Sequence, residues 1–144
     1  MEKSKDNDLD KSSEYAMLAK NLARNTDVLE KQFEKYGLTV SSYGFEISES
    51  NLSDKKTIIY AMVEIISTGF DNLGDDNYEV CVNLYDENGS MVGTSKHNSW
   101  DGGRYSFLNN TNFDGIGVYK AATYGKNIEI YAHKARIYII KVEK

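Results

Sequence analysis

The side chains best suited to metal or nucleophilic chemistry are few: two histidines, His97 and His133, and one cysteine, Cys81. None stands three or four residues from another, the spacing that places two ligands on one helix face. Val80 and Val82 alternate around Cys81 as in a strand, where a free cysteine usually serves as a small buried hydrophobe. No G-x-S-x-G turn is present. The sequence therefore predicts a protein that is not an enzyme and has no cofactor.

An acidic loop offers the better metal site. It carries Asp71, Asp75 and Asp76, and Glu79 follows closely. Several carboxylates on one flexible loop suit Ca²⁺, although the segment does not follow the EF-hand pattern. The alternative is a solvated turn, because Asp, Asn and Gly favour turns in any case.

A second loop, residues 98–112, holds large aromatic side chains. Most of the 11 tyrosines fall in the strand-rich part of the chain, where strand propensity accounts for them. That reason does not apply to Trp100 and Tyr105, which flank Asp101-Gly102-Gly103-Arg104. Loops commonly carry binding, and Trp, Tyr and Arg are frequent interface anchors. We therefore predict that Trp100, Arg104 and Tyr105 contact a partner protein.

The N-terminal part is expected to hold one helix. Residues 1–12 are polar and predicted to be disordered, and apolar side chains in residues 13–36 recur at helical spacing. Gly37 follows the last of them and favours a helix end, whereas Asn25-Thr26-Asp27 is the weakest stretch, where the helix could kink or restart. The apolar stripe packs on the rest of the domain in the main interpretation. In the alternative, a seven-residue repeat forms a coiled-coil seam in a homodimer: Tyr15, Leu22, Leu29 and Tyr36.

The remainder, residues 38–144, has the two-residue period of strands. Thr57–Ser67 is apolar on both faces, which predicts a strand covered on both sides. Residues 78–85 and 91–97 predict a hairpin whose Asn88-Gly89 would form a type I′ turn. Further strands are expected at 38–47, 116–122, 126–132 and 135–142. There are 0 prolines, so every strand residue can donate its N–H. The sequence predicts an α+β, mostly β fold: an N-terminal amphipathic helix and then an antiparallel β-sandwich of six to seven strands.

The hairpin Val82-Asn83-Leu84-Tyr85-Asp86-Glu87-Asn88-Gly89, with Met91-Val92-Gly93 after it, resembles the centre of the FxLYD-type bacterial domains. Val82 stands where that family has an aromatic residue. The resemblance spans about residues 57–144 and implies an immunoglobulin-like sandwich that serves as a non-enzymatic cell-envelope or surface module. It supplies no catalytic residues.

Charge and processing signals narrow the function further. The net charge is −5, with the acidic excess in residues 37–100, which disfavours nucleic-acid binding. No run of 18 apolar residues could span a membrane. No apolar stretch follows the polar start, so no signal peptide is present as written; this fits a cytoplasmic protein. A polar stretch of this kind also remains after a lipoprotein signal is removed, and the protein would then lie at the cell surface. We therefore predict a non-catalytic protein-binding domain; the alternative is a small acidic regulatory or inhibitory protein of phage or mobile-element type that acts through residues 71–87.

Overall fold

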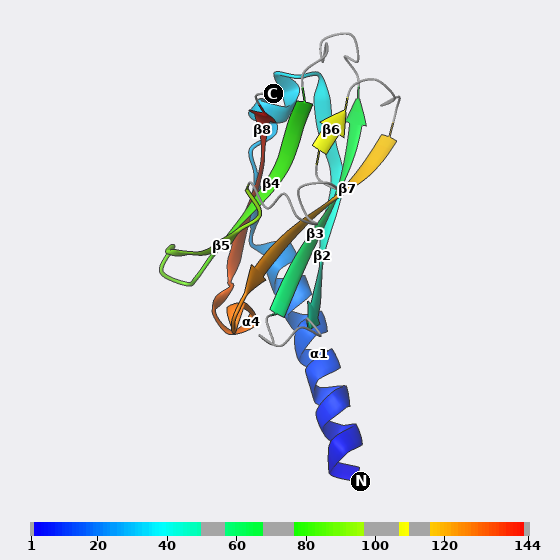
Figure 1. Cartoon of the computed structure of the whole chain (residues 1–144), viewed down its shortest axis with the longest axis vertical. Helices are drawn as coiled ribbons and strands as arrows, with labels where there is room; N and C mark the ends of the chain where they lie inside the picture. The colour runs from blue at the N-terminus through cyan, green and yellow to red at the C-terminus, as the bar shows by residue number, and fades with distance from the viewer. Residues whose placement is uncertain (1, 50–56, 68–76, 97–106, 110–115, 143–144) are drawn as a thin grey trace.

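The computed structural model describes residues 2–49, 57–67, 77–96, 107–109 and 116–142. Most of the described residues lie in strands, and helix α1 comes before all of the strands along the chain (Figure 1). The elements are α1 (Glu2–Arg24), β1 (Thr26–Val28), α2 (Glu30–Glu34), β2 (Leu38–Glu49), β3 (Thr57–Ser67), β4 (Asn77–Tyr85), β5 (Met91–Thr94), β6 (Phe107–Asn109), β7 (Ile116–Gly125), α4 (Ile128–Tyr131) and β8 (Lys134–Val142). The predicted β-rich α+β fold is confirmed at this level. No helix among these elements is long and apolar enough to cross a lipid bilayer.

The strands form two sheets. The large sheet has the order β1-β8-β4-β5, with β6 also paired to β4, and the small sheet has the order β2-β3-β7. β1 pairs with β8 in parallel, whereas the other pairings are antiparallel. Residues 38–142 hold seven of the eight described strands, β2 to β8, which fits the expected six to seven, and the pairings among them are antiparallel. The eighth strand, β1, lies in the segment expected to be helical and adds one parallel pairing.

One hydrophobic core joins both sheets and the N-terminal helices. Alternate residues of β3 are almost fully buried: Ile59, Ala61, Val63 and Ile65. They share the core with Val80, Val82 and Leu84 of β4 and with Ile137 and Ile139 of β8. The opposite face of β3 is covered only in part: Ile58 is buried, whereas Tyr60 and Met62 are partly exposed. Lys120 of β7 lies over the Tyr60 ring at 4.2 Å from its centroid and supplies part of the cover.

The expected helix over residues 13–36 is two helices separated by a strand. The Asn25 side chain donates to the Asn21 carbonyl at 2.9 Å, and the Thr26 hydroxyl donates to the Leu22 carbonyl at 2.5 Å. These bonds satisfy carbonyls of the last helical turn, as short polar side chains do at helix ends. Thr26–Val28 then extends along β8. The coiled-coil seam therefore does not lie on one helix, and Leu22 from that seam is fully buried in the core.

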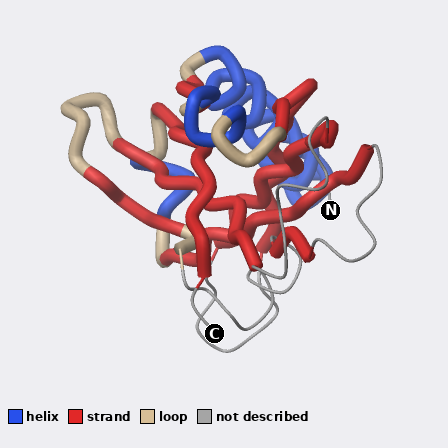
Figure 2. The backbone as a smooth tube through the Cα atoms, turned by 90° about the horizontal axis from the view of Figure 1, so that it is seen from above, coloured by secondary structure: helices blue, strands red, loops and turns tan. Residues whose placement is uncertain are grey.

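Helix α1 begins at Glu2, inside the segment expected to be disordered, and packs against β2. The Tyr15 hydroxyl donates to Glu49 Oε1 at 2.7 Å, and the Tyr43 hydroxyl donates to the Ala23 carbonyl at 3.4 Å. In Figure 1 the N-terminal turns of α1 extend beyond the strands, and Figure 2 shows the helical segments gathered mainly on one side of them. The C-terminal half of α1 is thereby an integral part of the core.

Two turns differ from expectation. Gly89 has a positive φ of 86°, but Asn88 does not, so the hairpin turn is not type I′. Asp86 organises a longer turn instead, since its Oδ1 accepts the N–H groups of Asn88 and Ser90, each at 2.9 Å. Residues 126–132, expected as a strand, hold the short helix α4 (Ile128–Tyr131). Asn127 adopts the left-handed conformation at φ 62°, which turns the chain and buries Ile128.

We predict that Gly93→Ala destabilises the fold. A methyl group at Gly93 would lie 2.6 Å from Thr123 Cγ2 and 2.7 Å from Ile128 Cδ1, so packed side chains would have to move. The expected loss is about 1–3 kcal/mol of unfolding free energy, measured by urea denaturation. Gly44→Ala is the matched control because nothing lies within 4 Å of its added methyl group. Equal stability of the two variants would contradict the described packing of β5 on β7 and α4.

A second prediction concerns α1. Leu22→Ala should cost about 2–5 kcal/mol of unfolding free energy, because it leaves a cavity at a fully buried position. Met17→Ala on the same helix should change stability by less than about 0.5 kcal/mol, because Met17 is 64% exposed. Thermal and urea unfolding of both variants measure this difference. A Leu22→Ala protein as stable as the parent would show that α1 is not part of the core.

Candidate functional site

The outer face of the large sheet carries a line of polar side chains that we call the polar row: Asp27, Arg136, Asn83 and Thr94. They come from β1, β8, β4 and β5 respectively. Strand register places Asp27 opposite Arg136, Arg136 opposite Asn83, and Asn83 opposite Thr94. Opposed residues on one sheet face lie close enough to interact. The β4–β5 hairpin and two segments distant from it in the sequence, β1 and β8, thus contribute to one continuous surface.

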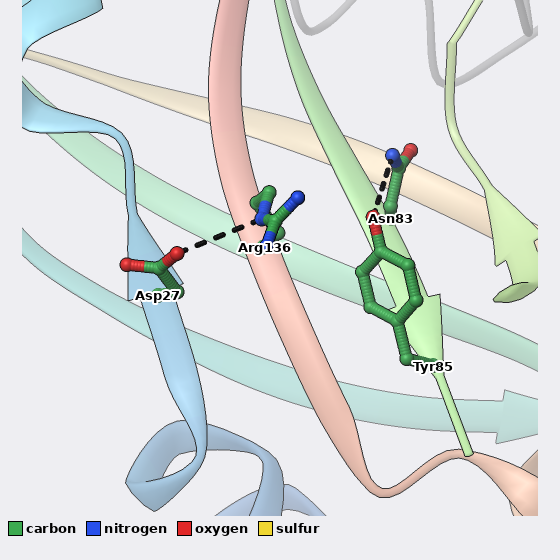
Figure 3. A network of polar contacts seen from close by, with 4 residues as sticks. All are labelled: Asp27, Asn83, Tyr85 and Arg136. Atoms are coloured by element: carbon green, nitrogen blue, oxygen red, sulfur yellow. Dashed lines mark hydrogen bonds and ion pairs between the residues drawn. The ribbon is translucent and has the colours of Figure 1, made fainter. Parts of the chain in front are cut away.

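Asn83 is the centre of the hydrogen bonds on this face. Its Oδ1 accepts from the Thr94 hydroxyl at 2.5 Å and from the Tyr138 hydroxyl at 3.1 Å. Its Nδ2 donates to the Tyr85 hydroxyl at 3.1 Å (Figure 3). The two tyrosines flank the polar row, and each is fixed by a bond to the same amide. Partly buried aromatic rings are therefore held in place before any partner arrives.

Arg136 joins the polar row to a shallow hollow of about 310 Å³. Its guanidinium lies 5.5 Å from the centroid of the Tyr85 ring, and its Nε lies 3.6 Å from Asp27 Oδ2 (Figure 3). Both members of the ion pair are about half exposed or more, so the pair orients Arg136 and adds little stability. The hollow is lined by Asn25, Asp27, Tyr85, Gly89, Lys134, Ala135 and Arg136. Lys134 and Arg136 outnumber the single carboxylate, Asp27, so the hollow carries a net positive charge that favours an acidic group.

Two groups next to the polar row, the Tyr138 phenol and the Cys81 thiol, are held in their neutral, protonated forms. Burial raises the pKa of the Tyr138 phenol, and the bonds to Thr94 and Asn83 only partly oppose this. Tyr138 therefore stays a hydrogen-bond donor at neutral pH. Burial, and then the charge of Glu79, raise the pKa of the Cys81 thiol well above its usual range. Cys81 is fully buried, as is usual for a free cysteine, although alternation places it on the face opposite Val80 and Val82; its thiol is a poor nucleophile.

The predicted site residues lie mostly outside the described part of the chain. This holds for the partner-binding residues Trp100, Arg104 and Tyr105 and for three of the calcium ligands, Asp71, Asp75 and Asp76. The fourth, Glu79, is described: it lies in β4 and is 1% exposed. Calcium binding at this loop stays a prediction. Within the described ranges, no three His, Cys, Asp or Glu side chains gather as metal ligands would.

The polar row was not predicted from the sequence. Strand alternation in 78–85 and 135–142 separates the polar positions of β4 and β8 from the core positions. It does not indicate that β8 lies between β1 and β4, and Asp27 was expected on a helix. One sequence pattern could have indicated the row. In both β4 and β8 a polar residue stands two positions before a tyrosine: Asn83 before Tyr85, and Arg136 before Tyr138.

Comparison with known proteins does not assign the chain to a family. No protein-family profile matches the chain, and no curated protein matches it. Among solved structures, a β-glucuronidase from glycoside hydrolase family 2 is 14% identical over 68% of this chain, with a TM-score of 0.33. A penta-heme cytochrome c552 from Thermochromatium tepidum is 14% identical over 71% of this chain, with a TM-score of 0.26. The chain spans 11% and 28% of their lengths, and at these TM-scores neither bears on its fold or activity.

The neutral state of Cys81 gives a testable pH dependence. The unfolded state loses the thiol proton near pH 8.5, whereas the folded state keeps it to higher pH. Between about pH 8.5 and 10 the unfolded state therefore binds fewer protons, and the free energy of unfolding should fall as the pH rises. Urea denaturation at several pH values measures the slope.

Cys81→Ala is the control, and its slope over this interval should be smaller than that of the parent. In parallel, a thiol reagent such as Ellman's reagent should modify the native protein on the order of a hundredfold more slowly than the urea-unfolded chain. Rapid labelling of the native protein at pH 8 would contradict the buried, neutral thiol.

Proposed function

We propose that this chain is a non-catalytic protein-binding domain and that the outer face of the large sheet is its contact surface. The observation that carries the proposal is the convergence of Tyr85, Tyr138 and Thr94 on Asn83, beside the Arg136 guanidinium. Tyrosine and arginine are the side chains that most often dominate binding energy at protein interfaces.

Preorganisation supports this interpretation. A side chain that is ordered only on binding costs about 0.5–1.5 kcal/mol. Asn83 already fixes both tyrosine hydroxyls, and Asp27 orients Arg136. Less ordering therefore remains for the moment of binding. The hollow of about 310 Å³ is open and shallow, which suits one inserted side chain, and its two cations favour a carboxylate.

The finer fold belongs to the same proposal. We infer an immunoglobulin-like sandwich of the FxLYD type, supported by one core that both sheets share and by the β4–β5 hairpin from Val82 to Gly93. A cell-envelope or surface module is the setting that this resemblance implies. Trp100, Arg104 and Tyr105 stay candidate contacts in addition to the polar row.

The alternative, an acidic regulatory protein acting through residues 71–87, has little acidic surface in the part of that segment that the structure describes: of the three acidic residues there, only Glu87 is exposed. Glu79 is buried in β4. Asp86 directs one carboxylate oxygen to two N–H groups of its own turn.

Two matched double variants test the proposed surface. Tyr85→Ser with Arg136→Ser removes an aromatic–cation pair from the large sheet. Tyr60→Ser with Lys120→Ser removes a comparable pair from the outer face of the small sheet. Partners are identified by cross-linking and mass spectrometry with the parent protein in extracts of the source cells, and their affinities are then measured with purified components.

The large-sheet variant should bind at least tenfold more weakly, which corresponds to about 1.4 kcal/mol, because it loses two anchoring side chains. The small-sheet variant should bind like the parent, and both should remain folded by circular dichroism. If the two variants lose affinity equally, or if only the small-sheet variant does, the polar row is not the contact surface.

A further inference from the structure

The outer face of the small sheet is apolar at positions where a sandwich normally exposes polar residues. Along β3, Tyr60, Met62 and Ile66 alternate with the core residues, and all three are partly exposed. Val118 of β7 shares this side of the sheet, because it pairs with Glu64, and it is 63% exposed. We call these four apolar side chains the apolar face. Exposed apolar patches on a folded domain mark interaction surfaces.

Helix α1 does not cover the apolar face. It packs on the core side of β2, where Leu22 joins the core and the Tyr43 hydroxyl donates to the Ala23 carbonyl. Tyr43 and the buried Phe45 lie two positions apart on β2 and so share the core side. Gly44, between them, faces the other way, and a methyl group added there would meet nothing within 4 Å. The small sheet is therefore open to a partner on its outer side.

Two charges of opposite sign accompany the apolar face. Glu46 of β2 is exposed and pairs with Tyr60 in the strand register. Lys120 comes from β7, on the other side of β3, and its ammonium lies over the Tyr60 ring, 4.2 Å from the centroid. Both charges are thus level with Tyr60, one from each neighbouring strand. Neither has an ion-pair partner among the residues that the structure describes, whereas Glu64 accepts the Ser41 hydroxyl at 2.7 Å.

We propose that the apolar face binds the apolar face of a second copy of this chain, so that two small sheets pack face to face about a two-fold axis parallel to their strands. This axis places β2 of one copy over β7 of the other, and Glu46 of each copy then faces Lys120 of the other copy. A two-fold axis across the strands would place β2 over β2 and keep the opposite charges apart. Charge therefore selects both the occupant and its orientation.

The second copy supplies what one chain lacks. The Thr57–Ser67 strand is apolar on both faces, which is typical of a strand covered on both sides, and a single copy covers one face fully and the other in part. In the dimer, Tyr60 and Met62 are covered by the other sheet. The polar row lies on the other sheet's outer face, so the dimer leaves both polar rows accessible and goes beyond the proposed function.

The size of the interface predicts a weak dimer. The three strands of the small sheet have 12, 11 and 10 residues. At about 4.8 Å between strands and about 3.3 Å per residue, one face covers roughly 500 Å². Two faces together bury about 1,000 Å², the lower limit for a specific interface. We therefore expect a dissociation constant in the micromolar range.

Sedimentation velocity of the whole chain from micromolar to millimolar concentration measures this association. Val118→Asp should weaken dimerisation at least tenfold, because it places a carboxylate inside an apolar interface. Met17→Asp is the matched control, since Met17 is 64% exposed on α1 and the change in net charge is the same. It should dimerise like the parent, and both variants should remain folded by circular dichroism.

Charge reversal tests the two-fold symmetry. Lys120→Glu and Glu46→Lys should each dimerise about tenfold more weakly than the parent at low salt, because like charges then face one another at both contacts. An equimolar mixture of the two variants should form mixed dimers nearly as strong as the parent dimer. In the mixed dimer each chain supplies the charge that the other requires.

A parent protein that stays monomeric at millimolar concentration overturns the proposal. So does a dimer that survives Val118→Asp, or a mixture of the charge variants that associates no better than either alone. The Tyr85→Ser, Arg136→Ser variant should dimerise like the parent. The Tyr60→Ser, Lys120→Ser variant should be monomeric and keep the parent's affinity for a polar-row partner, so failure of the dimer and failure of the polar row are seen separately.

Discussion

The pairing of β1 with β8 is the interaction on which the rest of the architecture depends. Three residues, Thr26–Val28, leave the helical path and align in parallel with Ala135–Ile137. This pairing ends α1, starts α2 two residues later, and places both helices against the shared core through Leu22 and Phe33. It also brings Asp27 to Arg136, so Asp27 belongs to the polar row only because the N-terminal segment crosses to the large sheet.

The sequence predicts the β-rich fold well because its strongest patterns are local. Thr57–Ser67 is found with the bounds that its apolar run indicated, and Gly37, with φ 73°, lies at the end of the helical region as expected. The predictions fail where the conformation of a segment depends on contacts with residues distant in the sequence. Asn25-Thr26-Asp27 looks like the weak part of one helix, but only the unpaired side of β8 makes it a strand. Residues 126–132 alternate like a strand, yet Asn127 and the burial of Ile128 favour a helical turn.

The candidate site could be predicted only in part for the same reason. Tyr85 and Tyr138 are recognisable as strand tyrosines, and Cys81 as a buried thiol. That Asn83 bonds to both tyrosines depends on the register between β4, β5 and β8, which no short-range pattern contains. The contacts proposed from composition, Trp100, Arg104 and Tyr105, lie outside the described residues, so the polar row and the loop are separate candidates. Both are proposed to bind through aromatic and cationic side chains.

The most direct test of this account is the backbone conformation of residues 24–30, measured by nuclear Overhauser effects in the full chain. The β1–β8 pairing predicts cross-strand contacts from the Thr26 and Val28 backbone to Ala135 and Ile137, with extended-chain couplings at Asp27. Helical contacts between residues three apart, continuous from Ala23 through Glu30, would contradict it. In that case the polar row would lose Asp27, and the edge of β8 would have no neighbouring strand.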